Sequence, residues 1–168
     1  MINDITDLWI NNAKPSKGNI KFLNYVISRD GERFDSSNAI LDFNVDDDIA
    51  VGSWFRNNFW GNCRFQPAIV YPQGKRSADL KIFGKCPLID GDTIEIKIIG
   101  SVRKDGLIKR IKQAYGQSEN VLVDVSNYPF DENTIRYLLL SFIEKHDWIK
   151  LVAVKKDDAL LFVLKKEK

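Results

Sequence analysis

The second half of the sequence alternates between strand-like and helix-like segments, and this alternation restricts the possible fold more than any other feature. Residues 92–99 (DTIEIKII) and residues 120–126 (NVLVDVS) are short apolar runs, which are typical of buried strands. Apolar residues at helical spacing lie between these runs, over residues 101–116, and after them, over residues 130–146. Strands that are joined through a helix pair in parallel, so we expect parallel strands at the centre of a sheet.

Strands that follow one another without a helix surround this centre. Residues 63–72 and 77–83 precede the first buried strand, and residues 148–157 and 159–166 end the chain. Such consecutive strands are expected to pair antiparallel. A further helix is predicted over residues 46–62, which open with three aspartates, because negative charge is favourable at the start of a helix. The predicted fold is therefore an α/β domain with a mixed central β-sheet flanked by helices.

Residues 1–45 are expected to form a small N-terminal extension to this domain, which then covers residues 46–168. Within the extension, residues 20–35 are typical of a hairpin, because Asp30 and Gly31 form a favoured pair for a tight turn. The role of the extension and the oligomeric state are not predictable from these patterns.

Cysteine content and hydropathy indicate where the protein acts. The two cysteines, Cys63 and Cys86, are a poor basis for a disulfide framework and fit a reducing compartment. No apolar run approaches the length of a membrane span, and no secretion leader is evident. We therefore expect a soluble protein that acts in the cytoplasm, with no membrane partner. If the protein is exported, we expect the export signal to lie on another part of a longer secreted protein.

Charged residues inside the strand at residues 92–99 suggest a site. Side chains alternate between the two faces of a strand, so Glu95 and Lys97 share one face. A hairpin joins this strand to the preceding one, and antiparallel pairing would bring Asp79 beside both residues. Two neighbouring carboxylates repel each other, and Mg²⁺ or another hard divalent cation would relieve this repulsion. Lys97 would then orient or deprotonate a water, or neutralise charge in the transition state.

The same spacing fits a plain structural alternative. In that alternative Glu95 and Lys97 lie on a solvated face and pair with Lys81 on the neighbouring strand. An aspartate followed by Glu-x-Lys on the next strand is a loose pattern that often arises by accident. The spacing alone therefore leaves both interpretations open.

Basic residues gather after the Glu-x-Lys strand, although the net charge of the whole chain is only +2. Apart from one acid, Asp105, the charged side chains of this segment after Lys97 are all cationic: Arg103, Lys104, Lys109, Arg110 and Lys112. If the apolar side of the helix packs on the sheet, the cations form a rim beside Glu95 and Lys97. There they would contact the phosphates of a nucleic acid without reading its sequence. A solvated helix face is the alternative.

The chain from Asp46 to Lys166 resembles the nuclease domains at the C-termini of contact-dependent growth inhibition (CdiA-type) toxins and related polymorphic toxins. The shared order is an acidic helix, an apolar strand, an Asp-containing strand, a Glu-x-Lys strand and a basic helix that ends in Gln. It is also the layout of the PD-(D/E)xK restriction-endonuclease-like superfamily. The resemblance implies that fold, and a metal-dependent phosphodiesterase toxin that cleaves nucleic acid, with tRNA favoured over DNA.

The resemblance also implies roles for individual residues. Asp79 and Glu95 match the acids that hold the metal ion, Lys97 matches the catalytic lysine, and Gln113 matches a frequent glutamine of the helix that follows. One departure is Ala78, which stands where the family often has proline.

The family also has an acid on its first helix and an inhibitory partner. The acid falls on Asp46, Asp47 or Asp48, of which Asp47 is the expected metal ligand. An immunity protein, acidic enough to cover the basic rim, is the expected partner. Two alternatives remain open: a catalytically inactive nuclease-fold binding module, and a metal-free ribonuclease toxin.

Overall fold

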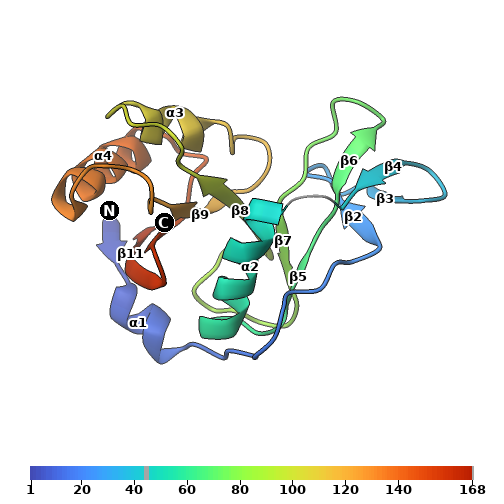
Figure 1. Cartoon of the computed structure of the whole chain (residues 1–168), viewed down its shortest axis with the longest axis horizontal. Helices are drawn as coiled ribbons and strands as arrows, with labels where there is room; N and C mark the ends of the chain where they lie inside the picture. The colour runs from blue at the N-terminus through green and yellow to red at the C-terminus, as the bar shows by residue number, and fades with distance from the viewer. Residues whose placement is uncertain (44–45, 168) are drawn as a thin grey trace.

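A mixed seven-stranded sheet forms the centre of the computed structural model, which describes residues 1–43 and 46–167 (Figure 1). The strands lie side by side in the order β1 (Ile2–Asp4), β11 (Ala159–Lys166), β10 (Leu151–Lys156), β9 (Asn120–Asp124), β8 (Thr93–Ile98), β7 (Leu80–Ile82) and β5 (Cys63–Phe65). Strands β8, β9 and β10 pair in parallel, and the remaining pairs are antiparallel. The α/β class with a mixed central sheet is thereby confirmed.

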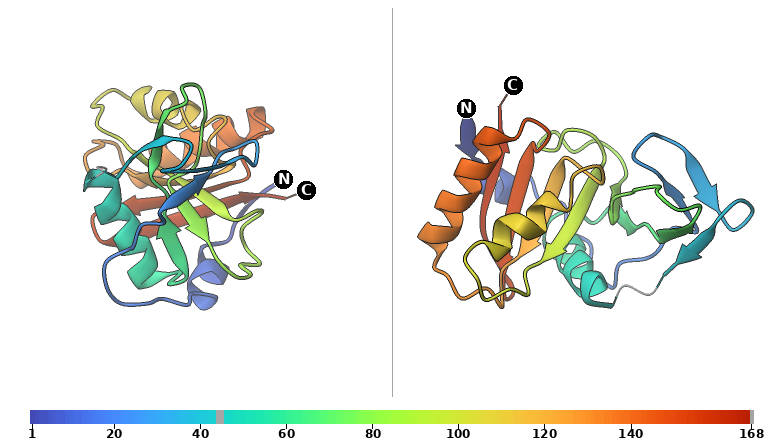
Figure 2. Two further views of the ribbon diagram at one scale, coloured as in Figure 1. Left: turned by 90° about the vertical axis from the view of Figure 1, so that its right-hand side faces the viewer. Right: turned by 90° about the horizontal axis from the view of Figure 1, so that it is seen from above.

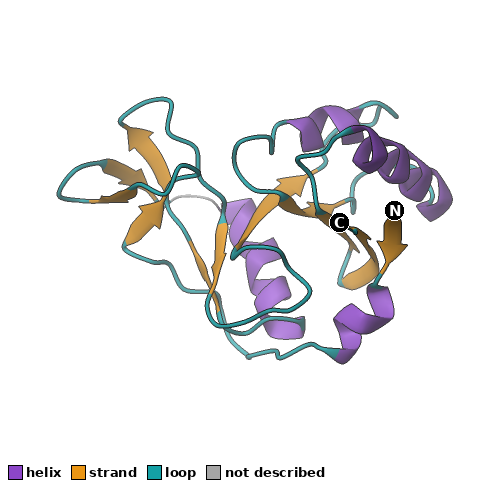
Figure 3. Ribbon diagram, turned by 180° about the vertical axis from the view of Figure 1, so that it is seen from behind, coloured by secondary structure: helices purple, strands orange, loops and turns teal. Residues whose placement is uncertain are grey.

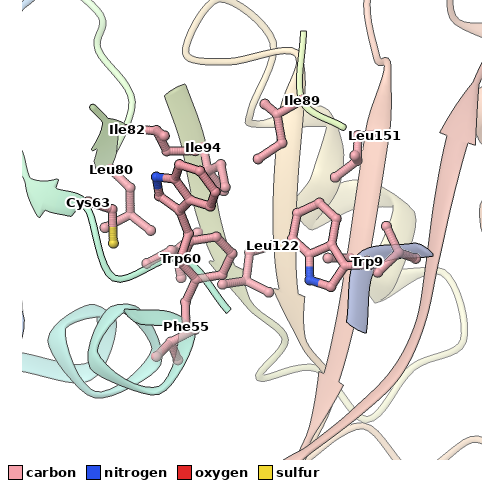
Figure 4. Packing of buried hydrophobic residues seen from close by; sticks show 14 of the residues in the cluster. Trp9, Phe55, Trp60, Cys63, Leu80, Ile82, Ile89, Ile94, Leu122 and Leu151 are labelled. Atoms are coloured by element: carbon pink, nitrogen blue, oxygen red, sulfur yellow. The ribbon is translucent and has the colours of Figure 1, made fainter. Parts of the chain in front are cut away.

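Helices cover both faces of this sheet, as the view from above shows (Figure 2). Helices α3 (Gly106–Lys112) and α4 (Glu132–Lys145) pack on one face, and α1 (Thr6–Asn11) and α2 (Asp46–Asn58) pack on the other. The cluster under α1 and α2 is rich in aromatic side chains that meet the apolar residues of the strands (Figure 4): Trp9, Phe55, Trp60, Leu80, Ile94 and Leu122. The centre of the sheet is therefore buried on both sides, as parallel strands require.

Helix α4 matches the pattern that predicted a helix over residues 130–146. Asp131 caps its start, since the side chain accepts a hydrogen bond from the N–H of Thr134 at 2.8 Å. Within the part of the chain that the structure describes, no helix has both the length and the apolarity to cross a bilayer.

Helix α3 is shorter than the predicted helix over residues 101–116. The side chain of Ser101 accepts a hydrogen bond from the N–H of Arg103, which stabilises a local turn in place of the first helical turn. Gly106 then begins the helix in close contact with Ser101, where an added Cβ would lie 2.3 Å from the serine side chain. The basic residues Arg103 and Lys104 consequently lie on the loop before α3.

The first 45 residues are divided between two parts of the molecule. Strand β1 pairs with β11 at the edge of the central sheet, and Trp9 of α1 is buried in the core. The predicted hairpin is present as β2 (Tyr25–Ile27) and β3 (Arg33–Asp35).

The hairpin belongs to a small projecting unit. We call this unit, formed by β2, β3, β4 (Ile40–Asp42) and β6 (Ala68–Tyr71), the β lobe; it projects from one end of the molecule (Figure 3). Strand β4 pairs with β6, which was expected to continue β5. The lobe therefore combines the N-terminal hairpin with a segment from the centre of the chain.

Candidate active site

The candidate site forms where strands β7 and β8 separate. Their pairing covers Leu80 with Ile94 and Lys81 with Thr93, and Asp79 immediately precedes it. Beyond that point Asp79 replaces strand pairing, because its side-chain Oδ2 accepts a hydrogen bond from the N–H of Ile96 at 2.9 Å. The N–H of Asp79 in turn donates to Oε1 of Glu95 at 3.0 Å. The predicted proximity of Asp79 and Glu95 is thus present in the structure.

Glu95 and Lys97 form a buried ion pair. Nζ of Lys97 lies 2.9 Å from Oε2 of Glu95, and their side chains are 7% and 3% exposed. Glu95 is paired with Val121 of β9, whose side chain lies in the cluster under α3 and α4, so both charges point to that covered face. The alternative of a solvated face paired with Lys81 is wrong, because Lys81 contacts Asp92 instead.

Burial raises the affinity of the two acids for protons. The pKa of Asp79 is well above its usual range, because burial disfavours the charged form and the Glu95 carboxylate repels a second negative charge. Burial also raises the pKa of Glu95, against the opposing effect of the Lys97 ammonium. The pair of carboxyls therefore holds protons more tightly than exposed acids do, and a cation at this position would displace them.

The third acid of the site is Asp48, which lies in the first turn of α2. Burial and the Asp79 carboxylate raise its pKa to about 6, while Arg110 and Lys97 act in the opposite direction. Asp47, the ligand expected from the resemblance, is exposed, and the side chain of Asp46 lies outside the described part of the structure. Asp48 is therefore the better candidate on α2, because its position on the helix faces Asp79.

Two glutamines follow the Glu-x-Lys strand, and the structure distinguishes them. Oε1 of Gln117 accepts a hydrogen bond from Nζ of Lys97 at 3.0 Å. Gln113 is exposed at the end of α3, and its side-chain oxygen accepts a hydrogen bond from Arg110. Sequence reasoning selected Gln113 on the resemblance and missed Gln117, which lies in the turn after the helix and so falls outside any helical pattern.

The five cations of the predicted rim lie on α3 and on the loop before it, and they differ in their surroundings. Arg110 is nearest, since its Nε donates to the carbonyl oxygen of Ile98 at 3.4 Å and its charge acts on Asp48. Arg103 and Lys109 both pair with Asp105, at 3.3 and 3.1 Å.

The other two cations of the rim are open to a partner. Lys104 and Lys112 are exposed and form no ion pair with any described residue. A depression of about 250 Å³ lies between the loop and α3, and it is lined by Gly100, Ser101, Arg103, Asp105, Gly106, Lys109, Arg110 and Gln113. Its three cations outnumber its one acid, Asp105, and the excess positive charge suits phosphate groups.

The donor set has the chemistry that a hard divalent cation prefers, because Asp48, Asp79 and Glu95 all offer carboxylate oxygens. Over the described residues, however, no group of three acidic, histidine or cysteine side chains stands ready to hold an ion. Both carboxylate oxygens of Glu95 are already engaged, by the N–H of Asp79 and by Lys97. A metal ion at this position would therefore share the Glu95 carboxylate with these two donors.

No family model matches the chain, and no significant match was found among curated proteins or solved structures.

Proposed function

We propose that the protein is a metal-dependent phosphodiesterase that cleaves nucleic acid, with RNA such as tRNA preferred to DNA. The observation that carries this proposal is the cluster of Asp79, Glu95 and Lys97 at the separation of β7 and β8, with Asp48 and Arg110 beside it. Metal-dependent cleavage of a phosphodiester needs acids to hold the cation and cationic groups to stabilise the developing charge.

Each residue has a chemical task in this proposal. Asp48, Asp79 and Glu95 would hold a divalent cation, which when bound supplies Lewis acidity toward the phosphate and lowers the pKa of water. Lys97 stabilises negative charge on the scissile phosphate through Nζ, and Gln117 holds that nitrogen in place. Arg110 and the exposed lysines bind the flanking phosphates and keep the strand in register.

A cleavage assay with matched variants tests the proposal. End-labelled tRNA and DNA are incubated with the protein in Mg²⁺ or in EDTA, under single-turnover conditions. We expect cleavage only with Mg²⁺, and a loss of about 100-fold or more in Glu95→Gln. Glu144→Gln, an exposed acid on α4, serves as the control and should cleave normally. Cleavage that survives both EDTA and Glu95→Gln would reject the assigned site.

One observation favours a second candidate, a catalytically inactive binding module on the same fold. Because both oxygens of Glu95 are already engaged, the ion pair is satisfied without a metal ion. Isothermal titration with Mn²⁺ separates the two candidates, since the inactive module would take up no metal ion. EDTA-resistant cleavage that depends on Lys97 would instead indicate a metal-free ribonuclease.

The toxin context is part of the same proposal. A nuclease of this kind, acting in the cytoplasm of a target cell, would require an immunity protein in the cell that makes it. The exposed cations on and before α3 would be the natural surface for an acidic inhibitor. Protection from cleavage by a co-produced acidic protein, competed by salt, would support this partner.

A further inference from the structure

A second concave surface lies between the β lobe and the turn that follows α3. It encloses about 420 Å³ and is lined by Arg29, Asp30, Gly74, Lys75, Arg76 and Gly116. In Figure 1 the lobe with β2, β3, β4 and β6 stands apart from α3, and β7 and β8 with the start of α2 lie between them. The surface therefore adjoins the end of α3, where Arg76 contacts the carbonyl oxygen of Gln113.

The charges on this surface are unequally compensated. Lys75 is neutralised by Asp30 and Glu32, at 3.2 and 2.9 Å. Arg29 is exposed and pairs with no acid among the described residues. Arg76 donates at 2.7 Å to a backbone carbonyl, that of Gln113, which leaves its charge uncompensated. Two guanidinium groups with free positive charge thus stand next to the end of α3.

Both arginines are held at a defined position relative to Asp79. The N–H of Arg29 donates to the carbonyl oxygen of Arg76 at 2.7 Å, which joins the hairpin to the segment that leads into β7. Gln66 is buried and reinforces this link, because it accepts from the N–H of Ile27 and donates to the carbonyl of Ala78. Only two residues separate Arg76 from Asp79, so the backbone at both arginines is held in place before any ligand arrives.

We propose that the β lobe is the second half of a nucleic-acid clamp, in which Arg29 and Arg76, next to the end of α3, bind the sugar–phosphate backbone of the strand that the basic rim binds along that helix. This inference rests on the proposed function, because it takes the same substrate class. Guanidinium groups suit phosphate oxygens, which they can bind with two parallel hydrogen bonds. A nucleic-acid strand would then cross the site from α3 to the lobe.

The surface also predicts where the bound strand ends. Beyond Arg29 lies an adjoining depression of about 210 Å³, whose lining includes the acids Asp90, Asp92 and Glu119. Carboxylates repel phosphates, so the backbone would not continue past Arg29 in this direction.

Binding measured without cleavage tests the clamp. Fluorescence anisotropy in EDTA, with labelled tRNA and a single-stranded RNA, gives the affinity at several salt concentrations between about 50 and 300 mM KCl. In Arg29→Ala we expect affinity to fall about 3- to 10-fold near 100 mM, and the slope of log affinity against log salt to fall by about one. Lys145→Ala removes an exposed cation from α4 and should change neither quantity.

Variants at both arginines and an acidic polymer provide further tests of the clamp. Arg29→Glu should weaken binding more than Arg29→Ala, and Arg76→Lys, which keeps the charge, should weaken it less than Arg76→Ala. An unchanged affinity and salt slope in Arg29→Ala would overturn the clamp, as would the absence of salt-dependent binding by the unsubstituted protein. If Arg29→Ala weakened binding to polyglutamate as much as to RNA, the lobe would be a surface for acidic proteins instead. Because cleavage is not measured, failure of the clamp is distinct from failure of the proposed function.

Discussion

The carboxylate of Asp79 accepts a hydrogen bond from the backbone N–H of Ile96 at 2.9 Å, at the point where pairing between β7 and β8 stops. A side chain thus takes the place of the next strand residue in satisfying a buried N–H group. This arrangement opens the sheet locally, and it brings the acid next to Glu95 without leaving an unsatisfied donor.

Replacing Asp79 should lower the rate of cleavage without lowering the free energy of unfolding. In Asp79→Asn the amide oxygen can still accept from Ile96, while one of two mutually repelling carboxyls is lost. We expect cleavage to fall by about 100-fold or more, with the free energy of unfolding unchanged or raised by about 1 kcal/mol. Urea denaturation and the cleavage assay check the two parts. If the loss of cleavage in Asp79→Asn came with a matching loss of unfolding free energy, this would argue against a direct role of Asp79 in catalysis.

Removing Lys97 should destabilise the fold, because it leaves Glu95 buried without its cationic partner. We expect Lys97→Met to cost about 3–5 kcal/mol of unfolding free energy, and Glu95→Gln combined with Lys97→Met to recover most of it. Lys81→Met breaks the ion pair to the exposed Asp92 and should cost about 1 kcal/mol or less. A cost at Lys97 no larger than that at Lys81 would contradict the buried ion pair.

Asp48 should make stability depend on pH. Its pKa is raised to about 6, so the folded state holds the proton more tightly than the unfolded state. The stability that this group contributes is present below about pH 4 and is lost as pH rises through about 6.

The variant Asp48→Asn isolates this contribution. At pH 7.5 it should be more stable than the unsubstituted protein by about 1 kcal/mol, a value discounted for partial exposure, and at pH 4 the difference should vanish. Asp47→Asn, in the same helical turn, is the control for loss of charge at the helix start. A difference for Asp48→Asn that stays constant from pH 4 to 7.5 would contradict the raised pKa.

The two glutamines after β8 should differ in their effect on catalysis. Gln117→Ala removes the hydrogen bond to Nζ of Lys97, and we expect the rate of cleavage to fall about 10-fold with a shifted pH–rate profile. Gln113→Ala affects an exposed side chain that contacts Arg110 and should leave the profile unchanged. If Gln113→Ala shifted the profile and Gln117→Ala did not, Gln113 would be the catalytic glutamine, as the resemblance implies.

Much of the architecture could be predicted because it depends on neighbouring residues. The acidic start and apolar spacing of α4 are local signals, and the predicted helix over residues 130–146 is present as Glu132–Lys145. The same holds for β8 and β9, which are apolar runs bounded by turns, and for the hairpin with Gly31 at a positive φ of 86°. The alternation of these elements then implied parallel pairing, which the structure confirms.

Other features depend on contacts between residues far apart in the chain. Whether Asp47 or Asp48 faces the site depends on the rotation of α2 against the sheet, which no local pattern specifies. The partner of Lys97 is Gln117 because α3 ends early and the following turn folds back over β8. The pairing of β4 with β6 joins segments about 30 residues apart.

Local patterns were thus enough to assign α4, β8, β9 and the N-terminal hairpin, and to raise the hypothesis that Asp79, Glu95 and Lys97 lie near one another. Packing in three dimensions decided the burial of the Glu95–Lys97 pair and the choice of Asp48. It also decided the position of Arg29 and Arg76 beside the end of α3. The physical reason is that hydrogen bonding and periodicity act over a few residues along the chain. Desolvation and charge interactions depend on every group that is close in space, wherever it stands in the sequence.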